Sequence, residues 1–135
     1  MAGYSKTPLV KKLGIKEGFK IAILNAPENY AQTLGELPEN IIVSDTLGRS
    51  LDFIHFFSTQ RDTLAAEFSR LKQALAPNGL LWISWPKRSA KVETDLTEDI
   101  IRAIGLDNGL VDVKVAAVDE VWSGLKFVYR LKDRK

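Results

Sequence analysis

Two cations and an indole stand together after one apolar run, and they are the side chains best suited to bind a ligand. Trp85 closes the run, Pro86 follows it, and Lys87 and Arg88 come next. An aromatic ring beside cationic groups suits an anionic or aromatic ligand. The competing interpretation is that Pro86 ends a strand and the basic residues form a solvated loop. The sequence leaves both interpretations open.

Two other polar segments follow apolar runs in the same way. Residues 25–28 come after the run 19–24, and Ser58 comes after the run 51–57. In open parallel sheets, ligands collect outside the carboxyl ends of the strands. We therefore expect these segments to build one site with the tryptophan and the cations. The predicted ligand-binding residues are Asn25, Pro27, Glu28, Ser58, Trp85, Lys87, Arg88 and Asp95.

Asp95 also has a structural interpretation. Glu98 follows it at the spacing of a capping pair, and acidic residues are favourable at the start of a helix. The sequence predicts that a helix begins here. In the alternative hypothesis, Asp95 or Glu98 faces Lys87 across the site.

A second candidate surface lies between two alternating segments near the C-terminus, where a hairpin is expected. Asp119, Glu120 and Trp122 stand at its tip. Exposed aromatic residues anchor interfaces, so these three residues are predicted to bind a partner. In the competing interpretation, Trp122 folds back onto the sheet.

A hydrolase triad has no support in this sequence. His55, the sole histidine, lies inside an apolar run and is interpreted as a core residue. Ser58 and Ser84 have no base close to them in the sequence.

Composition excludes several kinds of chemistry. The chain of 135 residues has no cysteine and one histidine, so no metal site is predicted. The net charge of +2 makes a nucleic-acid partner an unfavoured expectation. Basic residues gather near both ends of the chain; they form either solvated tails or, if the ends share a face, a patch for polyanions. No segment is apolar enough to span a membrane or to form a signal core, so a cytoplasmic location is expected.

Helices and strands alternate along most of the chain. Helices are expected at 7–13, 29–34, from 58 or 59 to 75, and from 95, and strands at 19–24, 41–43, 51–57, 80–85, 111–118 and 126–131. The segment 76–79 contains Pro77 and Gly79 and is expected to end a helix. This order predicts one α/β domain over residues 1–135. Its fold class is three-layer and Rossmann-like, with a mostly parallel twisted sheet and a C-terminal antiparallel hairpin.

The pattern resembles a reduced class I methyltransferase domain. The features that carry the resemblance are the entry into the run 16–24, the helix end and strand at 75–83, and the closing unit 100–129. The chain is also similar to a family of small bacterial proteins known as domain-of-unknown-function family 3052. That similarity rests on residues 4–9, 25–28, 85–87, 94–99 and 118–125.

The resemblance to methyltransferases implies S-adenosylmethionine on a glycine-rich turn after the first strand, and an acidic residue after the second strand. Asp45 stands near the second position. At the first position, residues 25–30 contain no glycine, Pro27 removes a backbone donor, and Tyr30 adds bulk. Asn29 is able to adopt a left-handed turn. We therefore predict no cofactor, and S-adenosylmethionine is disfavoured.

The function predicted from the sequence is a binding or regulatory module on a degenerate methyltransferase-like scaffold. Its partner would be a small anionic ligand or a protein. The alternative is an enzyme, either a divergent S-adenosylmethionine-dependent methyltransferase or one that acts on a small anionic substrate. A third hypothesis is an assembly protein that forms homo-oligomers through the hairpin.

Overall fold

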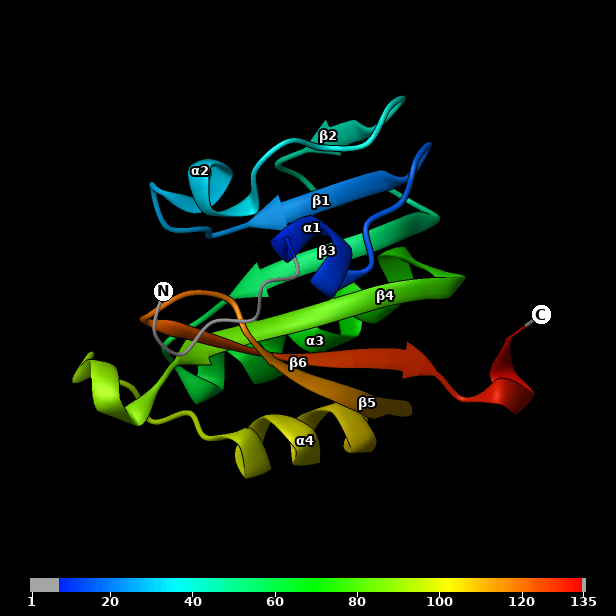
Figure 1. Ribbon diagram of the computed structural model, residues 1–135. Coiled ribbons are helices and arrows are strands. Elements are labelled where there is room, and N and C mark those ends of the chain that lie inside the picture. Colours follow the sequence, from blue (N-terminus) through cyan, green and yellow to red (C-terminus); the bar gives the residue numbers. More distant parts are fainter. Residues whose placement is uncertain (1–7, 135) are drawn as a thin grey trace.

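The computed structural model describes residues 8–134 and shows a six-stranded sheet with helices on both faces (Figure 1). Residues 1–7 and 135 lie outside the described part, so the expectations for Thr7 and for a patch formed by the two chain ends are not addressed. The elements in chain order are α1 (Leu9–Leu13), β1 (Lys20–Leu24), α2 (Tyr30–Leu34), β2 (Ile42–Ser44), β3 (Leu51–Phe57), α3 (Arg61–Ala74), β4 (Leu75–Pro86), η1 (Arg88–Ala90), α4 (Glu98–Asp107), β5 (Leu110–Ala117), β6 (Trp122–Tyr129) and η2 (Leu131–Asp133).

The sheet has the strand order β2-β1-β3-β4-β6-β5. The first four strands of this order run parallel, because each is reached through a crossover connection. Strand β6 is antiparallel to β4 and to β5, which gives the predicted C-terminal hairpin. The predicted Rossmann-like class is confirmed. The carboxyl ends of β1, β2, β3 and β4 therefore meet at one edge of the sheet.

Each face of the sheet has its own apolar core, because successive side chains of a strand point to opposite faces. On β3, Ile54 and Phe56 pack under α3 and α4. Phe53 and Phe57 of the same strand pack on the other face, with α1 and α2. Figure 1 shows α1 in front of the sheet and α3 behind it.

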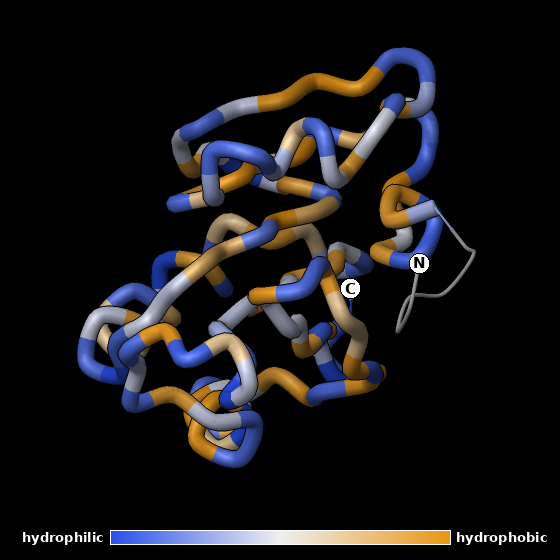
Figure 2. Tube along the Cα trace, turned by 60° about the vertical axis from the view of Figure 1, so that its left-hand side comes forward, coloured by the Kyte–Doolittle hydropathy of each residue, from blue (hydrophilic) through white to orange (hydrophobic). Residues whose placement is uncertain are grey.

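Strand β2, at one edge of the sheet, is short, and two of its apolar side chains are exposed to solvent. Ile42 is 61% exposed and Val43 is 51% exposed. Figure 2 shows a hydrophobic stretch of the chain along this outer edge. No helix within residues 8–134 is long and apolar enough to cross a membrane.

Two strands begin four or more residues before their predicted starts at 80 and 126. Strand β4 begins at Leu75, whereas residues 76–79 were expected to end a helix, because Leu75 pairs with Leu51 of β3. Strand β6 begins at Trp122 and not at residue 126. Ser123 and Gly124 belong to this strand because they pair with β4 and β5. Gly124 also lies over the Trp82 ring, where a Cβ atom would stand 2.9 Å from Cε3.

Candidate functional site

Three adjoining cavities follow the edge of the sheet where the parallel strands end, and we call them together the strand-end groove. The first has a volume of about 290 Å³, the second about 450 Å³ and the third about 530 Å³. Thr59 and Gln60 line both the first and the second cavity. Thr94 and Asp95 line both the second and the third. The shared residues make the groove continuous.

Asn25 stands at one end of the groove, directly after β1. Its φ of 61° is left-handed, a conformation that glycine adopts readily and other residues rarely do. Asn25 lines the first cavity, as does Ser58 after β3. Pro27 and Glu28 do not line the groove. Pro27 instead accepts a hydrogen bond at its carbonyl from the N–H of Tyr30, at 3.0 Å.

Two aromatic rings wall the first cavity. Phe57 and Trp122 meet edge to face, with their ring centroids 5.2 Å apart. Trp122 is half-buried and packs on the α1 side of the sheet, so it folds back onto the core, as the structural interpretation of the hairpin tip holds.

A buried polar chain lies behind Phe57. His55 stacks on Phe57, with 4.1 Å between the ring centroids. Its Nδ1 is 2.7 Å from the hydroxyl of Tyr30, and its Nε2 is 2.7 Å from the hydroxyl of Ser84. Burial lowers the pKa of His55 to about 3, so the imidazole is neutral, and burial raises the pKa of Tyr30. His55 is a core residue, as predicted, and it does not line the groove.

The middle of the groove is acidic. Asp62, Glu93 and Asp95 line the second cavity. They do not form a metal site, since no three His, Cys, Asp or Glu side chains in residues 8–134 are arranged to hold an ion. Thr94 fixes the wall, because its hydroxyl donates to the carbonyl of Thr59 at 2.6 Å.

Asp95 caps a different helix from the one the sequence indicates. Its Oδ1 accepts a hydrogen bond from the N–H of Arg61, the first residue of α3, at 2.7 Å. Helix α4 is capped by Thr97, whose hydroxyl accepts from the N–H of Ile100 at 3.2 Å. Two predictions are therefore wrong: Asp95 and Glu98 are not a capping pair, and α3 begins at Arg61 after the N-cap Gln60, not at 58 or 59.

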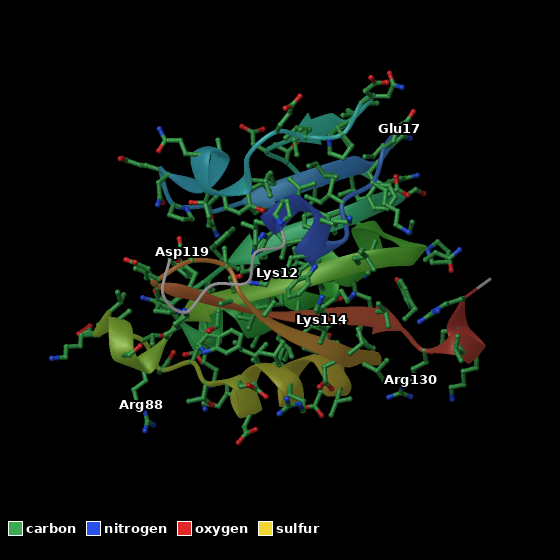
Figure 3. The ribbon with its side chains drawn as sticks, in the orientation of Figure 1. Lys12, Glu17, Arg88, Lys114, Asp119 and Arg130 are labelled. Carbon is green, nitrogen blue, oxygen red and sulfur yellow. The ribbon has the colours of Figure 1, made fainter. Side chains whose placement is uncertain are left out.

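Only one of the two neighbouring cations, Lys87 and Arg88, lines the third cavity. Arg88 lines it together with Trp85 and Glu98, whereas Lys87 does not. Figure 3 shows Arg88 pointing away from the body of the molecule. Trp85 is 7% exposed and belongs to the core under α4, so little of its indole is open to a ligand. Glu98 is bound by Arg102 and does not face Lys87.

The tip of the hairpin is a tight turn held by one carboxylate. Asp119 Oδ1 accepts from the N–H groups of Val121 and Trp122, at 2.8 and 2.7 Å. These bonds give Asp119 a structural role, while Glu120 is exposed.

Some residues that line the groove were not predicted from the sequence, and Asp45, an expected cofactor contact, lies outside the groove. Gln60, Thr63, Glu93 and Thr94 line the cavities. Only their position after a strand or before a helix gives a signal, and that signal is weak. Asp45 is exposed beyond β2 and does not line the groove.

No family model and no curated protein matches the sequence, so the similarity to domain-of-unknown-function family 3052 is not supported. Solved structures do match. One is a SAM-dependent methyltransferase from Aquifex aeolicus, with a TM-score of 0.58, 17% identity, and 88% of this chain and 86% of that chain covered. Another is magnesium protoporphyrin IX methyltransferase from Synechocystis PCC 6803 with bound SAH, with a TM-score of 0.58, 14% identity, and 90% and 78% covered.

A third similar structure is fibrillarin from Aeropyrum pernix in complex with S-adenosyl-L-methionine, with a TM-score of 0.56, 18% identity, and 93% and 70% of the two chains covered. These structures overturn the expectation that such a scaffold goes without a cofactor, since they hold S-adenosylmethionine or SAH in this fold. Nor do they support a non-enzymatic module. The chain has the Rossmann-like fold of S-adenosylmethionine-dependent methyltransferases.

Proposed function

We propose that this protein is a divergent S-adenosylmethionine-dependent methyltransferase that binds its cofactor in the strand-end groove. The observation that carries the proposal is the position of Asn25. It supplies a left-handed turn directly after β1 and lines a cavity there. A residue held in a rare backbone conformation at a cavity is a mark of a functional site. The turn thus has the backbone shape of a glycine turn without the glycine.

The residues of the groove fit the charge of this cofactor. S-adenosylmethionine carries a sulfonium cation, which makes its methyl group electrophilic when it is bound. Aromatic rings attract such cations, and Phe57 and Trp122 wall the first cavity. The carboxylates of the second cavity add a negative potential next to them.

Polar side chains supply the remaining contacts. Ser58, Thr59 and Gln60 follow β3 and line the first cavity. Their hydroxyl and amide groups donate and accept hydrogen bonds, as the ribose hydroxyls and the amino-acid end of the cofactor require. Five polar side chains and two aromatic rings line the first cavity, so it offers both hydrogen bonds and stacking surface to a ligand.

The third cavity is the place we assign to the methyl acceptor. It adjoins the second cavity through Thr94 and Asp95, so a molecule bound there lies next to the proposed cofactor site. Arg88 at its rim favours an anionic acceptor.

Calorimetric titration with S-adenosylmethionine and with S-adenosylhomocysteine tests the proposal. We expect both to bind the wild type. We expect Trp122→Leu to weaken S-adenosylmethionine binding about tenfold, since a cation–aromatic contact contributes about 1–2 kcal/mol. The loss should be smaller for S-adenosylhomocysteine, which lacks the cation. Glu93→Gln should likewise weaken the binding of S-adenosylmethionine more than that of S-adenosylhomocysteine.

Asn25→Ala has a matched control in Asn40→Ala. Both asparagines have a left-handed φ, 61° and 62°, but Asn40 does not line the groove. Weaker cofactor binding in the first variant alone supports the proposed site. Failure of the wild type to bind either compound at millimolar concentration contradicts the proposal, and so does equal weakening by both substitutions.

A further inference from the structure

Two lysines face each other across the hairpin. Lys114 of β5 and Lys126 of β6 are register partners in the antiparallel pair. Like charges in directly opposite positions destabilise a sheet. This arrangement therefore costs stability in the isolated chain, and local structure alone gives no reason for it.

A β-bulge produces the pairing. Asp112 is opposite Phe127, and the register shifts before Lys114, so that Val113 is the extra residue. With regular pairing, Lys114 would be opposite Leu125 and would point to the other face. Bulges redirect side chains in this way and often lie near functional sites. Here the bulge brings Lys114 to the face of the sheet on which Lys126 lies.

A third lysine reaches the same place from α1. The ammonium of Lys114 lies 3.3 Å from the carbonyl oxygen of Lys12, and the ammonium of Lys12 donates to the carbonyl of Ala117 at 2.9 Å. Figure 3 shows Lys12 and Lys114 side by side on the α1 face. The ammonium of Lys126 stands 5.8 Å from the centre of the Trp82 ring. We call Lys12, Lys114 and Lys126 the lysine cluster.

None of the three ammonium groups forms an ion pair within residues 8–134, and the pKa values of two of them are lowered. Burial, and then the charges of Lys114 and Lys87, lower the pKa of Lys12; burial, and then Lys114, lower the pKa of Lys126. The ion pairs found within residues 8–134 involve only arginines as cations. An anion bound here would therefore relieve a repulsion that the described part of the chain leaves uncompensated.

We propose that the lysine cluster binds the phosphate groups of a small ligand of the pyrophosphate type. Each ammonium has three donors, and Lys12 and Lys114 each use one on a carbonyl, so donors remain for a ligand. Lys114 reaches the backbone of Lys12 and pairs in register with Lys126, which suits one multiply charged group. A nucleic-acid strand needs a longer basic track with exposed aromatic rings for stacking, and Trp82 and Trp85 are buried. The site is separate from the strand-end groove, which none of the three lysines lines.

Titration with inorganic pyrophosphate, followed by calorimetry and by thermal unfolding, tests the proposal. We expect binding that raises the Tm and weakens as salt is added. We expect Lys114→Met and Lys126→Met each to weaken it about tenfold or more, the effect of losing a charged hydrogen bond. Without ligand, both variants should unfold at the wild-type temperature or above it, because a repulsion is removed.

Lys11→Met is the matched control, since Lys11 is an exposed lysine of the same helix α1 outside the cluster. It should bind pyrophosphate as the wild type does. Equal weakening by Lys11→Met would show diffuse attraction and overturn the proposal. So would a wild type that ignores pyrophosphate but binds a single-stranded oligonucleotide, or a lower Tm in both cluster variants, which would indicate a purely structural role. Titration of S-adenosylmethionine on the same variants should be unchanged, so this proposal and the proposed function fail separately.

Discussion

The carboxylate of Asp95 accepts a hydrogen bond from the backbone N–H of Arg61 across a distance of 2.7 Å, although the two residues belong to different helical regions. This bond ties the loop before α4 to the first residue of α3. It also fixes the wall between the second and third cavities of the strand-end groove.

Asp95→Ala should lower the free energy of unfolding by about 1 kcal/mol, the usual cost of losing a helix cap. Urea denaturation measures it. Glu93→Ala is the control, because Glu93 is exposed in the same loop and should have no measurable effect on stability. An equal loss in both variants would mean that the cap contributes nothing specific.

The stability of the protein should depend on pH through its sole histidine. The pKa of His55 is about 3 in the folded protein, against 6.5 in the unfolded chain. Between these values only the unfolded chain binds the proton. The free energy of unfolding is therefore highest above pH 6.5 and falls as the pH falls, by about 1.4 kcal/mol per pH unit where the slope is steep.

Urea denaturation between about pH 7 and pH 5 tests this slope, because most carboxylates remain ionised in that window. In His55→Gln the slope should disappear, whatever the absolute stability of the variant. NMR should show no titration of the imidazole in the folded protein over the same range. A midpoint near 6.5 in the folded state would contradict the prediction.

Tyr30→Phe should destabilise the protein by about 1–3 kcal/mol, because it leaves His55 Nδ1 buried without its partner at 2.7 Å. Thermal and urea unfolding give the change. Tyr129→Phe is a useful comparison, since the Tyr129 hydroxyl donates to the carbonyl of Lys72 but the side chain is only partly buried. We expect Tyr129→Phe to destabilise the protein less than Tyr30→Phe does. A larger loss for Tyr129→Phe would contradict the explanation through the buried bond to His55.

Gly105→Ala should destabilise the protein by about 1–3 kcal/mol or more through overpacking. A Cβ atom at this position in α4 would stand 2.0 Å from Cε1 of Phe127. Gly48→Ala is the matched control, because no heavy atom lies within 4 Å of its Cβ position and its φ is not left-handed. Differential scanning calorimetry of the two variants should separate them clearly.

The elements with strong local patterns could be predicted from the sequence. Strand β3 has the predicted bounds 51–57. Of the four residues that recur at helical spacing, Leu64, Phe68 and Leu71 lie within α3, whereas Leu75 begins β4. The start of β6 could not be predicted, because Gly124 belongs to the strand through its pairing with Ser84 of β4 and Ala116 of β5. Tertiary contacts of this kind override local propensity.

The candidate site was predictable in its general place but not in its composition. The rule that ligands bind at strand ends led to Asn25 and Ser58, and both line the first cavity. Arg88 lines the third cavity and Lys87 does not, because the helical turn η1 begins at Arg88. No sequence pattern predicts this turn. The lysine cluster depends on a bulge and on contacts between residues 12 and 114. Such register changes and long-range contacts are set by the whole fold.

The bond between Lys12 and Ala117 joins residues 105 positions apart. A chain emerging from the ribosome therefore makes α1 well before the hairpin on which α1 is seated. During that interval Leu9, Val10 and Leu13, all buried in the finished protein, lack part of their cover. Docking of α1 is accordingly a late event in folding, one that non-local topology delays.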